Sequence, residues 1–315
     1  MTRTLSTREE FGRTLVRLGE MSRDVVVLDA DLSSSTCTRM FAERFPDRFF
    51  NMGISEQDLI GTAAGMSLAG RIAFACSFAV FVTGRCWEQI RQSVALPGVN
   101  VNIVGTHGGI TVGKDGASHQ ALEDIAVMRA IPSMTVIVPA DAVETRKAVE
   151  AAAWYDGPVY IRLTREKLPV VYPDEKRFRI GVGALVKEGD DVTLFGIGLT
   201  LHQALEAATL LEAEGIAARV VDLATVKPLD EDLVVRCAQE TGCVVTAEEH
   251  SIIGGLGDAV GEVLLRRHPV PMERIGVRDA FGRSGSPQDL LEYFELTPNA
   301  IAAAARRVVE RRGAA

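Results

Sequence analysis

The sequence lacks the basic surplus, the cysteine pairs and the long apolar runs that mark several protein classes. Its 34 Lys and Arg against 42 Asp and Glu give a net charge of −8 at pH 7. Nucleic-acid binding selects concentrated positive charge, so we expect no nucleic-acid partner. The basic runs at 266–268 and 306–312 are short, and we interpret them as solvated helix faces and C-terminal dipole partners.

Cysteine is scarce. The five cysteines are an odd number and contain no C-x-x-C pair, which fits neither a zinc site nor a disulfide framework. The longest apolar run, near 72–82, is well short of the roughly 20 residues that a membrane span needs. The first six residues have no apolar signal-peptide core. We therefore expect a cytoplasmic protein with no membrane partner.

The length and the alternation of patterns predict two α/β domains. A chain of 315 residues, 47% hydrophobic and 24% charged, is typical of a globular protein with about two domains. Continuous apolar runs typical of buried strands alternate with segments of helical spacing. We predict a first domain at 1–165, with a mostly parallel sheet and helices on both faces, and a smaller α/β domain at 190–315. The segment 166–189 has no sustained period and is interpreted as the linker.

Local signals place individual elements. Ser6-Thr7-Arg8-Glu9 predicts the capped start of a first helix. Apolar runs predict strands at 24–28, 72–77 and 101–105, and helical spacing predicts a helix over about 80–95. In the second domain we predict strands at 192–195, 218–223 and 243–247 and helices at 202–214, 259–267 and 301–311.

Three side chains of the first domain have both a structural and a chemical interpretation. Glu56 follows a strand at the start of a helix, where an acid complements the helix dipole. Because its preceding residues are small and apolar, it would alternatively be a buried carboxyl group that donates a proton to a ring nitrogen. Phe78 and Phe81 are either core packing or a platform on which a flat heterocycle stacks.

A glycine-rich loop at 105–120 carries His107, Asp115 and His119. Its five glycines let the backbone turn sharply and approach a ligand closely. Two histidines and one acid would be a metal site, but this spacing matches no common metal motif. We therefore predict no metal ligands in this chain.

Three motifs in order, at family-like spacing, resemble the transketolase family. They are Gly53-Ile54-Ser55-Glu56-Gln57, Ser77-Phe78-x-x-Phe81 and Gly113-Lys114-Asp115-Gly116-Ala117-Ser118-His119-Gln120. More narrowly, the chain resembles the C-terminal subunit of a split transketolase. The resemblance covers nearly the whole chain and implies a pyrimidine-binding domain followed by a transketolase C-terminal domain.

The resemblance implies thiamine diphosphate as cofactor. It assigns Glu56 to the hydrogen bond with N1′ of the aminopyrimidine, which makes Glu56 catalytic. Phe81 would stack on the pyrimidine ring, with Phe78 beside it. Leu32 would be an apolar contact near the thiazolium ring, and Asp31 a polar neighbour.

Substrate residues follow from the same resemblance. His119 would lie near the reacting oxygens of the ketose donor as a second catalytic residue, and Asp115 would form a hydrogen bond with a substrate hydroxyl group. Ser35, His107 and Arg165 would contact the phosphate end of sugar phosphate substrates, for which arginine is a bidentate partner.

The sequence departs from the family pattern at two points, and these limit what the resemblance implies. Gly84 stands where full-length transketolases usually carry a tyrosine, which leaves the shape of the pocket open. The Gly-Asp-Gly motif that binds diphosphate and Mg²⁺ in the family is absent from the sequence. We therefore expect an N-terminal partner subunit that carries this motif, an α2β2 heterotetramer, and no activity of this subunit alone.

The leading interpretation is the transfer of a two-carbon ketol unit from a ketose phosphate to an aldose acceptor. One alternative is the C-terminal half of a 1-deoxyxylulose-5-phosphate synthase-like enzyme, whose pattern tends to have arginine at the position of Phe81. A pyruvate dehydrogenase-type β subunit fits less well, because Asp115…His119 is not its pattern. A catalytically silent assembly subunit would have no physical need for the combination of Glu56, Phe81, Asp115 and His119.

Overall fold

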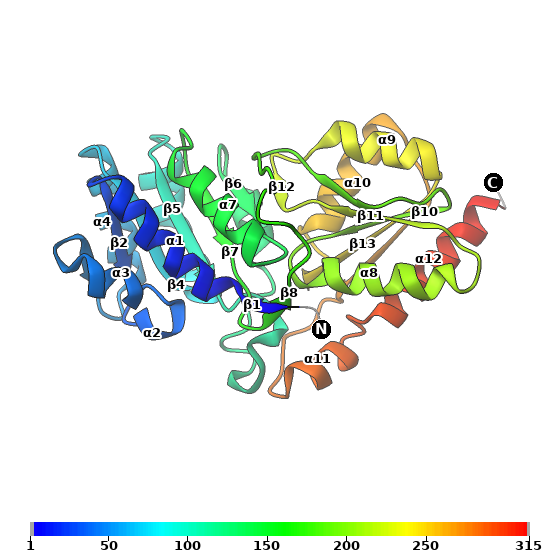
Figure 1. The fold of residues 1–315 in the computed structure, drawn as a ribbon, viewed down its shortest axis with the longest axis horizontal. Helices are drawn as coiled ribbons and strands as arrows, with labels where there is room; N and C mark the ends of the chain where they lie inside the picture. Colours follow the sequence, from blue (N-terminus) through cyan, green and yellow to red (C-terminus); the bar gives the residue numbers. More distant parts are fainter. Residues whose placement is uncertain (1–2, 314–315) are drawn as a thin grey trace.

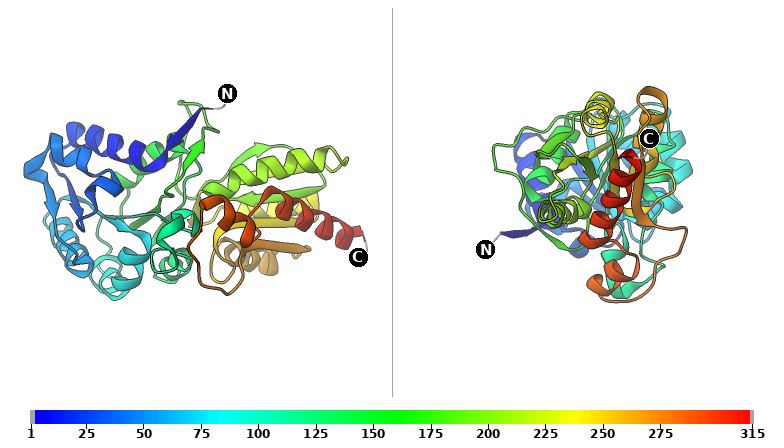
Figure 2. Two further views of the ribbon diagram at one scale, coloured as in Figure 1. Left: turned by 90° about the horizontal axis from the view of Figure 1, so that it is seen from below. Right: turned by 90° about the vertical axis from the view of Figure 1, so that its right-hand side faces the viewer.

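The computed structural model describes residues 3–313, so the outermost residues of both predicted domains, 1–2 and 314–315, lie outside the described residues. Two α/β units lie side by side along the long axis of the molecule (Figures 1 and 2). Within the described residues, no helix combines the length and the apolar character needed to cross a bilayer.

The first unit is organised by one sheet. Within residues 3–313 this sheet has seven strands in the order β12-β6-β7-β5-β4-β2-β3, and every neighbouring pair except β12 with β6 is parallel. The prediction of a mostly parallel sheet is thus confirmed. The strands are β2 (Val25–Asp29), β3 (Phe49–Asn51), β4 (Ile72–Phe78), β5 (Val101–Thr106), β6 (Thr135–Ile137), β7 (Val159–Arg162) and β12 (Thr225–Lys227).

Helices cover both faces of this sheet, as predicted (Figure 1). Successive strand residues point to opposite faces. In β2, Val25 and Val27 pack in one apolar cluster, whereas Val26 and Leu28 pack in another on the opposite face. The first cluster includes residues of α1 (Thr7–Met21), α3 (Arg39–Arg44) and α7 (Ala142–Ala153), and the second those of α4 (Glu56–Leu68), η2 (Phe81–Arg85), η3 (Ile90–Ala95) and α6 (Asp124–Arg129).

Two predicted helices can be compared with the structure in detail. The capped start of α1 is confirmed, because Ser6 Oγ accepts a hydrogen bond from the backbone N–H of Glu9 at 3.2 Å. The helix predicted over about 80–95 is helical but interrupted: η2 and η3 are π-helical and flank the short α5 (Trp87–Gln89). Such wide turns occur often at functional sites.

The second unit is also α/β, as predicted. In the part of the chain that the structure describes, its sheet has five strands in the order β14-β13-β10-β11-β9, and β9 is antiparallel to its neighbour. Helices α8 and α12 lie on one face and α9 and α10 on the other (Figure 1). The elements are β9 (Ala184–Lys187), β10 (Val192–Gly196), β11 (Ala218–Asp222), β13 (Val244–Ser251), β14 (Met272–Val277), α8 (Leu199–Glu212), α9 (Glu231–Thr241), α10 (Leu256–Arg267), α11 (Pro287–Tyr293) and α12 (Pro298–Gly313).

The segment between the two sheets contributes strands to both units. In it, β8 (Lys167–Pro169) pairs with β1 (Thr4–Ser6), and β9 is the edge of the second sheet. Conversely β12, which follows β11 in the chain, is the edge strand of the first sheet. The two units therefore interlock, and the limits of the linker at 166–189 stay a prediction.

Candidate active site

The predicted site residues collect at one edge of the first sheet. The parallel strands β2, β4 and β5 are neighbours, and their carboxyl ends lead to Leu32, Phe78 and His107. In open α/β sheets, ligands bind at this edge. The strand order therefore brings together candidates that are far apart in the sequence.

Glu56 is the first residue of α4, and its side chain is only 4% exposed. Its carboxylate accepts hydrogen bonds from Arg85 Nη1 at 3.0 Å and from Ser77 Oγ at 3.5 Å. The expected burial is present, and the charge has an arginine partner that the sequence did not indicate. A hollow of about 530 Å³ opens beside this pair, lined by Ile54, Ser55, Glu56, Gln57, Asp58 and Arg85.

Four rings form one aromatic group next to this hollow. Phe78 and Phe81 are stacked, with centroids 5.9 Å apart and planes within 16° of parallel. The ring of His107 lies 3.9 Å from that of Phe78, and His119 meets the ring of Phe81 edge-on at 5.2 Å. The core-packing interpretation suits Phe78, which is buried, whereas Phe81 is half-buried.

His107 is buried at the end of β5, and its Nδ1 lies 2.9 Å from Thr106 Oγ1. Burial, followed by the positive charges of Arg8 and Arg165 and by His119, lowers the pKa of His107 to about 3. His107 is therefore neutral at physiological pH, so its ring can form hydrogen bonds but carries no positive charge.

Two arginines lie at the outer end of the site. Arg165 pairs with Asp115 at 3.5 Å and donates to the carbonyl oxygen of Val112. Arg8, in the first turn of α1, donates to the carbonyl oxygens of Ser35 and Arg165. The sequence reasoning missed Arg8 because it assigned the residue to a helix cap alone. Burial lowers the pKa of Arg8, and its Nε has no hydrogen-bond partner within the described residues.

Asp31 and Leu32 form the turn after β2. Asp29 Oδ1 accepts a hydrogen bond from the backbone N–H of Leu32 at 2.6 Å, and burial raises the pKa of the Asp29 carboxyl group. Asp31 has a positive φ of 62° and accepts a hydrogen bond from Asn51 Nδ2 at 3.0 Å. The turn thus holds Leu32 at the edge of the sheet, while the side chain of Asp31 is exposed.

The loop that carries the substrate candidates is held by the second domain. The loop contains the short helix η4 (Ile110–Asp115), and in its first turn the backbone N–H of Thr111 donates to Glu249 Oε1 at 2.7 Å. Ser284 Oγ donates to the carbonyl oxygen of Lys114 at 2.7 Å, and Gln120 Nε2 donates to that of Arg283 at 2.9 Å. Local sequence signals did not indicate Glu249, because it lies 138 residues from its partner.

The residues present fit one end of thiamine diphosphate. A buried carboxylate beside a half-buried aromatic face suits a flat, protonatable heterocycle. Within residues 3–313, no group of three or more His, Cys, Asp or Glu side chains is placed so that it could hold a metal ion.

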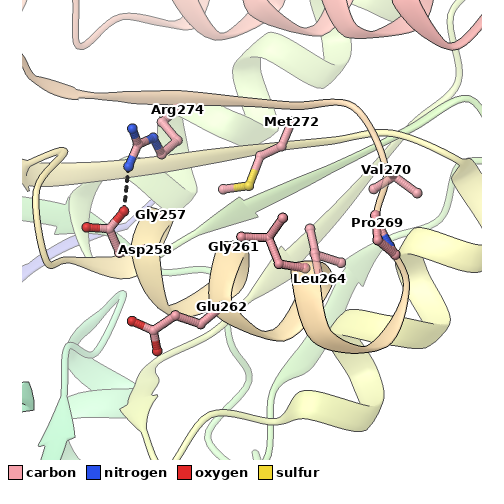
Figure 3. A pocket seen from close by; sticks show the side chains of 10 residues that line it. Gly257, Asp258, Gly261, Glu262, Leu264, Pro269, Val270, Met272 and Arg274 are labelled. Atoms are coloured by element: carbon pink, nitrogen blue, oxygen red, sulfur yellow. Dashed lines mark hydrogen bonds and ion pairs between the residues drawn. The ribbon is translucent and has the colours of Figure 1, made fainter.

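A second hollow, of about 440 Å³, lies between α10 and β14 and shares no residue with this site (Figure 3). Arg274 and Asp258 pair across its mouth at 2.5 Å, and Leu264 and Met272 belong to its apolar wall. Its charged lining residues are Asp258, Glu262 and Arg274.

Comparisons with known proteins agree with this arrangement. Residues 3–171 match the family described as "Transketolase, pyrimidine binding domain", and residues 181–301 match "Transketolase, C-terminal domain". A "Putative transketolase C-terminal section" of Methanocaldococcus jannaschii is 48% identical over 306 residues, which are 96% of this chain and 95% of that protein.

Two further relatives are subunits. The "6-deoxy-6-sulfo-D-fructose transketolase subunit SqwH" of Clostridium sp. (strain MSTE9) is 41% identical over 97% of this chain and 95% of that protein. A solved structure described as "Split gene transketolase, inactive beta4 tetramer" has 54% identity and a TM-score of 0.91, covering 97% of this chain and 99% of that chain. The chain therefore belongs to the transketolase family and corresponds to the C-terminal subunit of a split transketolase.

Proposed function

We propose that this subunit forms the pyrimidine side of a thiamine diphosphate site, in an enzyme that transfers a two-carbon ketol unit from a ketose phosphate to an aldose phosphate. The observation that carries the proposal is the buried carboxylate of Glu56 beside the aromatic group of Phe78, Phe81, His107 and His119. Thiamine diphosphate, when bound, supplies the reactive carbon that holds the two-carbon unit between the two sugars.

The protein's own groups bind and orient the cofactor, and they exclude water from it. Glu56 holds a proton at N1′ of the pyrimidine, and Phe81 presents the face on which that ring stacks. Phe78 closes the site from the sheet side, and Leu32 contributes an apolar contact near the thiazolium, with Asp31 as its polar neighbour. The buried setting strengthens these contacts because water does not compete for them.

The outer end of the site binds the substrate. Arg165 and the newly identified Arg8 present guanidinium groups to the phosphate, with neutral His107 and Ser35 beside them. Asp115 accepts a hydrogen bond from a substrate hydroxyl, and His119 lies near the reacting oxygens of the donor. The hydrogen bonds of Arg8 and Arg165 to backbone carbonyls support this role, because they fix the direction of both groups.

The diphosphate and Mg²⁺ belong to a partner chain in this proposal. An N-terminal subunit with the Gly-Asp-Gly motif would complete the site in an α2β2 heterotetramer. The absence of that motif here and the description of a related chain as an inactive tetramer of one subunit support this assignment. The five free cysteines support a reducing, cytoplasmic location.

The test is turnover by the purified complex of this subunit with its N-terminal partner. We expect transfer from xylulose 5-phosphate to ribose 5-phosphate that requires thiamine diphosphate and Mg²⁺. Glu56→Ala should lower kcat/KM by at least about a hundredfold, as loss of a positioned proton-transfer group does. Glu188→Ala, the same change at a carboxylate that is 77% exposed and lies outside the site, is the matched control and should leave the rate within about twofold.

Two outcomes would contradict the proposal. Full activity of the Glu56→Ala complex would exclude its role at the cofactor, and turnover by this subunit without a partner would exclude the shared site. Consumption of pyruvate in place of the ketose donor would instead favour the synthase-like activity.

A further inference from the structure

The side chain of Arg85 occupies the space between the two groups that the proposed function assigns to the cofactor ring. Its Nη1 lies 3.0 Å from Glu56 Oε2, and its Cζ lies 4.2 Å from the centre of the Phe81 ring. One planar, cationic group thus pairs with the acid and covers the aromatic face at the same time. A guanidinium is suited to both contacts, because it is flat, always charged and stacks on aromatic rings.

The local fold explains why Arg85 reaches this position. Phe81 and Arg85 are the first and last residues of the π-helical η2, and residues four apart on a helix lie on the same side. Gly84, the residue before Arg85, carries no side chain, and a Cβ added at Gly84 would meet nothing within 4 Å. Gln57 Nε2 donates to the backbone carbonyl of Arg85 at 3.1 Å and holds the main chain.

We propose that Arg85 is a placeholder for the pyrimidine ring. It is a positioning residue: in the subunit without cofactor it neutralises Glu56 and covers Phe81, and it moves aside when the ring enters. This inference rests on the proposed function, because it assumes that Glu56 and Phe81 receive the cofactor.

The Arg85 side chain has the freedom to move. It is 51% exposed, whereas that of Glu56 is 4% exposed. The hollow of about 530 Å³ that Arg85 helps to line offers space for a rotated side chain. Movement of one side chain is therefore sufficient, and the backbone of η2 can stay in place.

A first test needs no cofactor. In the isolated subunit, Arg85→Ala leaves the buried Glu56 carboxylate without its cationic partner, so the midpoint of thermal unfolding should fall by roughly 2 °C or more. Adding Glu56→Gln to that variant should restore part of the loss, because a neutral amide needs no cation. Arg91→Ala removes an exposed arginine from η3 that forms no ion pair within residues 3–313, and should leave the midpoint unchanged. No effect of Arg85→Ala, or no restoration by the second change, would overturn the proposal.

The second test is calorimetric titration of thiamine diphosphate, with Mg²⁺ present, into the complex with the N-terminal partner. A placeholder competes with the cofactor, so Arg85→Ala should bind it about three- to tenfold more tightly than the unchanged complex. Arg85→Lys, which keeps the charge but not the planar group, should lie between the two. A structural or cofactor-binding role predicts the opposite sign. Weaker or unchanged binding by Arg85→Ala would therefore overturn the proposal.

The same titration separates this inference from the proposed function. If the unchanged complex binds no thiamine diphosphate, both are wrong. If it binds the cofactor and loses turnover in Glu56→Ala, while Arg85→Ala leaves the dissociation constant unchanged, the proposed function stands and the placeholder is rejected.

Discussion

At the scale of single residues, burial decides the protonation state of His107. Desolvation, followed by the positive charges of Arg8 and Arg165 and by His119, lowers the pKa of its imidazole from 6.5 to about 3. Between these values the folded state binds fewer protons than the unfolded state. The stability that His107 contributes is therefore complete above about pH 6.5 and is lost as the pH falls toward about 3.

We expect the imidazole signals of His107 to keep their neutral positions in proton NMR spectra of the subunit from about pH 5 to about pH 8. The variant His107→Gln identifies these signals by removing them. A midpoint near 6.5 would show an imidazole open to solvent and would contradict its burial at the end of β5.

Sequence motifs identified the residues that are close to one another in the chain, but not those that reach the site from elsewhere. Glu56, Phe78 and His119 lie within recognisable local patterns. Arg85 and Glu249 carry no such pattern, because their partners lie 29 and 138 residues away. A charged residue on a helix or strand has many interpretations until the fold supplies its neighbour.

At the scale of elements, η4 depends on a contact from the second domain. Glu249 Oε1 accepts the hydrogen bond of the Thr111 backbone N–H, and burial raises the pKa of the Glu249 carboxyl group. Gly109 has a positive φ of 87°, and a Cβ there would collide with that carboxyl group. The close approach of the Glu249 carboxyl group to the backbone therefore requires glycine at position 109. The hydrogen bond from Thr111 to Glu249 fixes the start of the segment that leads to Asp115.

We expect Glu249→Ala to raise the KM for the ketose donor about five- to tenfold in the assembled complex, because the loss of a buried hydrogen bond worth about 1–1.5 kcal/mol loosens η4. Steady-state kinetics measure the change. Glu188→Ala, which removes a carboxylate that is 77% exposed in the same unit, is the control and should leave KM unchanged. An unchanged KM in Glu249→Ala would show that the loop is ordered without this contact.

Periodicity predicted most of the long elements, but it missed α9, β14 and the interruption of the helix at 80–95. The apolar residues of β2 are continuous, and the start of α1 is capped by Ser6, so both elements were visible in the sequence. β14 mixes Glu273 and Arg274 with apolar residues and is a strand because β13 pairs with it. α9 had an available signal, since Asp230 caps its first turn, which the pattern of apolar residues alone does not show. The π turns of η2 and η3 follow from packing, which sequence spacing does not reveal.

At the scale of the whole molecule, a buried cluster joins the two units. Lys176, from the predicted linker, pairs with Glu144 of α7 at 2.5 Å and lies 3.8 Å from Asp222 of β11. Tyr172 donates to Asp222 at 2.6 Å. Burial and the neighbouring Glu144 raise the pKa of the Asp222 carboxyl group well above its usual value. Lys176 is therefore the cation that balances the charge shared by Glu144 and Asp222.

We expect Lys176→Met to lower the midpoint of thermal unfolding by about 4–8 °C, because removing one member of a buried ion pair leaves the other charge uncompensated. Scanning calorimetry measures the shift. Lys147→Met, which breaks a partly exposed pair with Glu150 at 3.9 Å, should move the midpoint by less than about 1 °C. A similar small shift for Lys176→Met would show that the cluster does not hold the units together.

The position of β12 decides how this subunit can be recombined with its relatives. A chimera joined before Ala184 would supply β12 from the second parent, so the edge of the first sheet would pair with a foreign strand. A chimera joined after Lys227 would keep β12 but would split the second sheet between parents, separating β9, β10 and β11 from β13 and β14. A mismatched or missing edge strand leaves backbone groups that recruit other chains. No single crossover between β1 and β14 keeps every described strand beside its original neighbour, so we expect the two domains to be exchanged successfully only together.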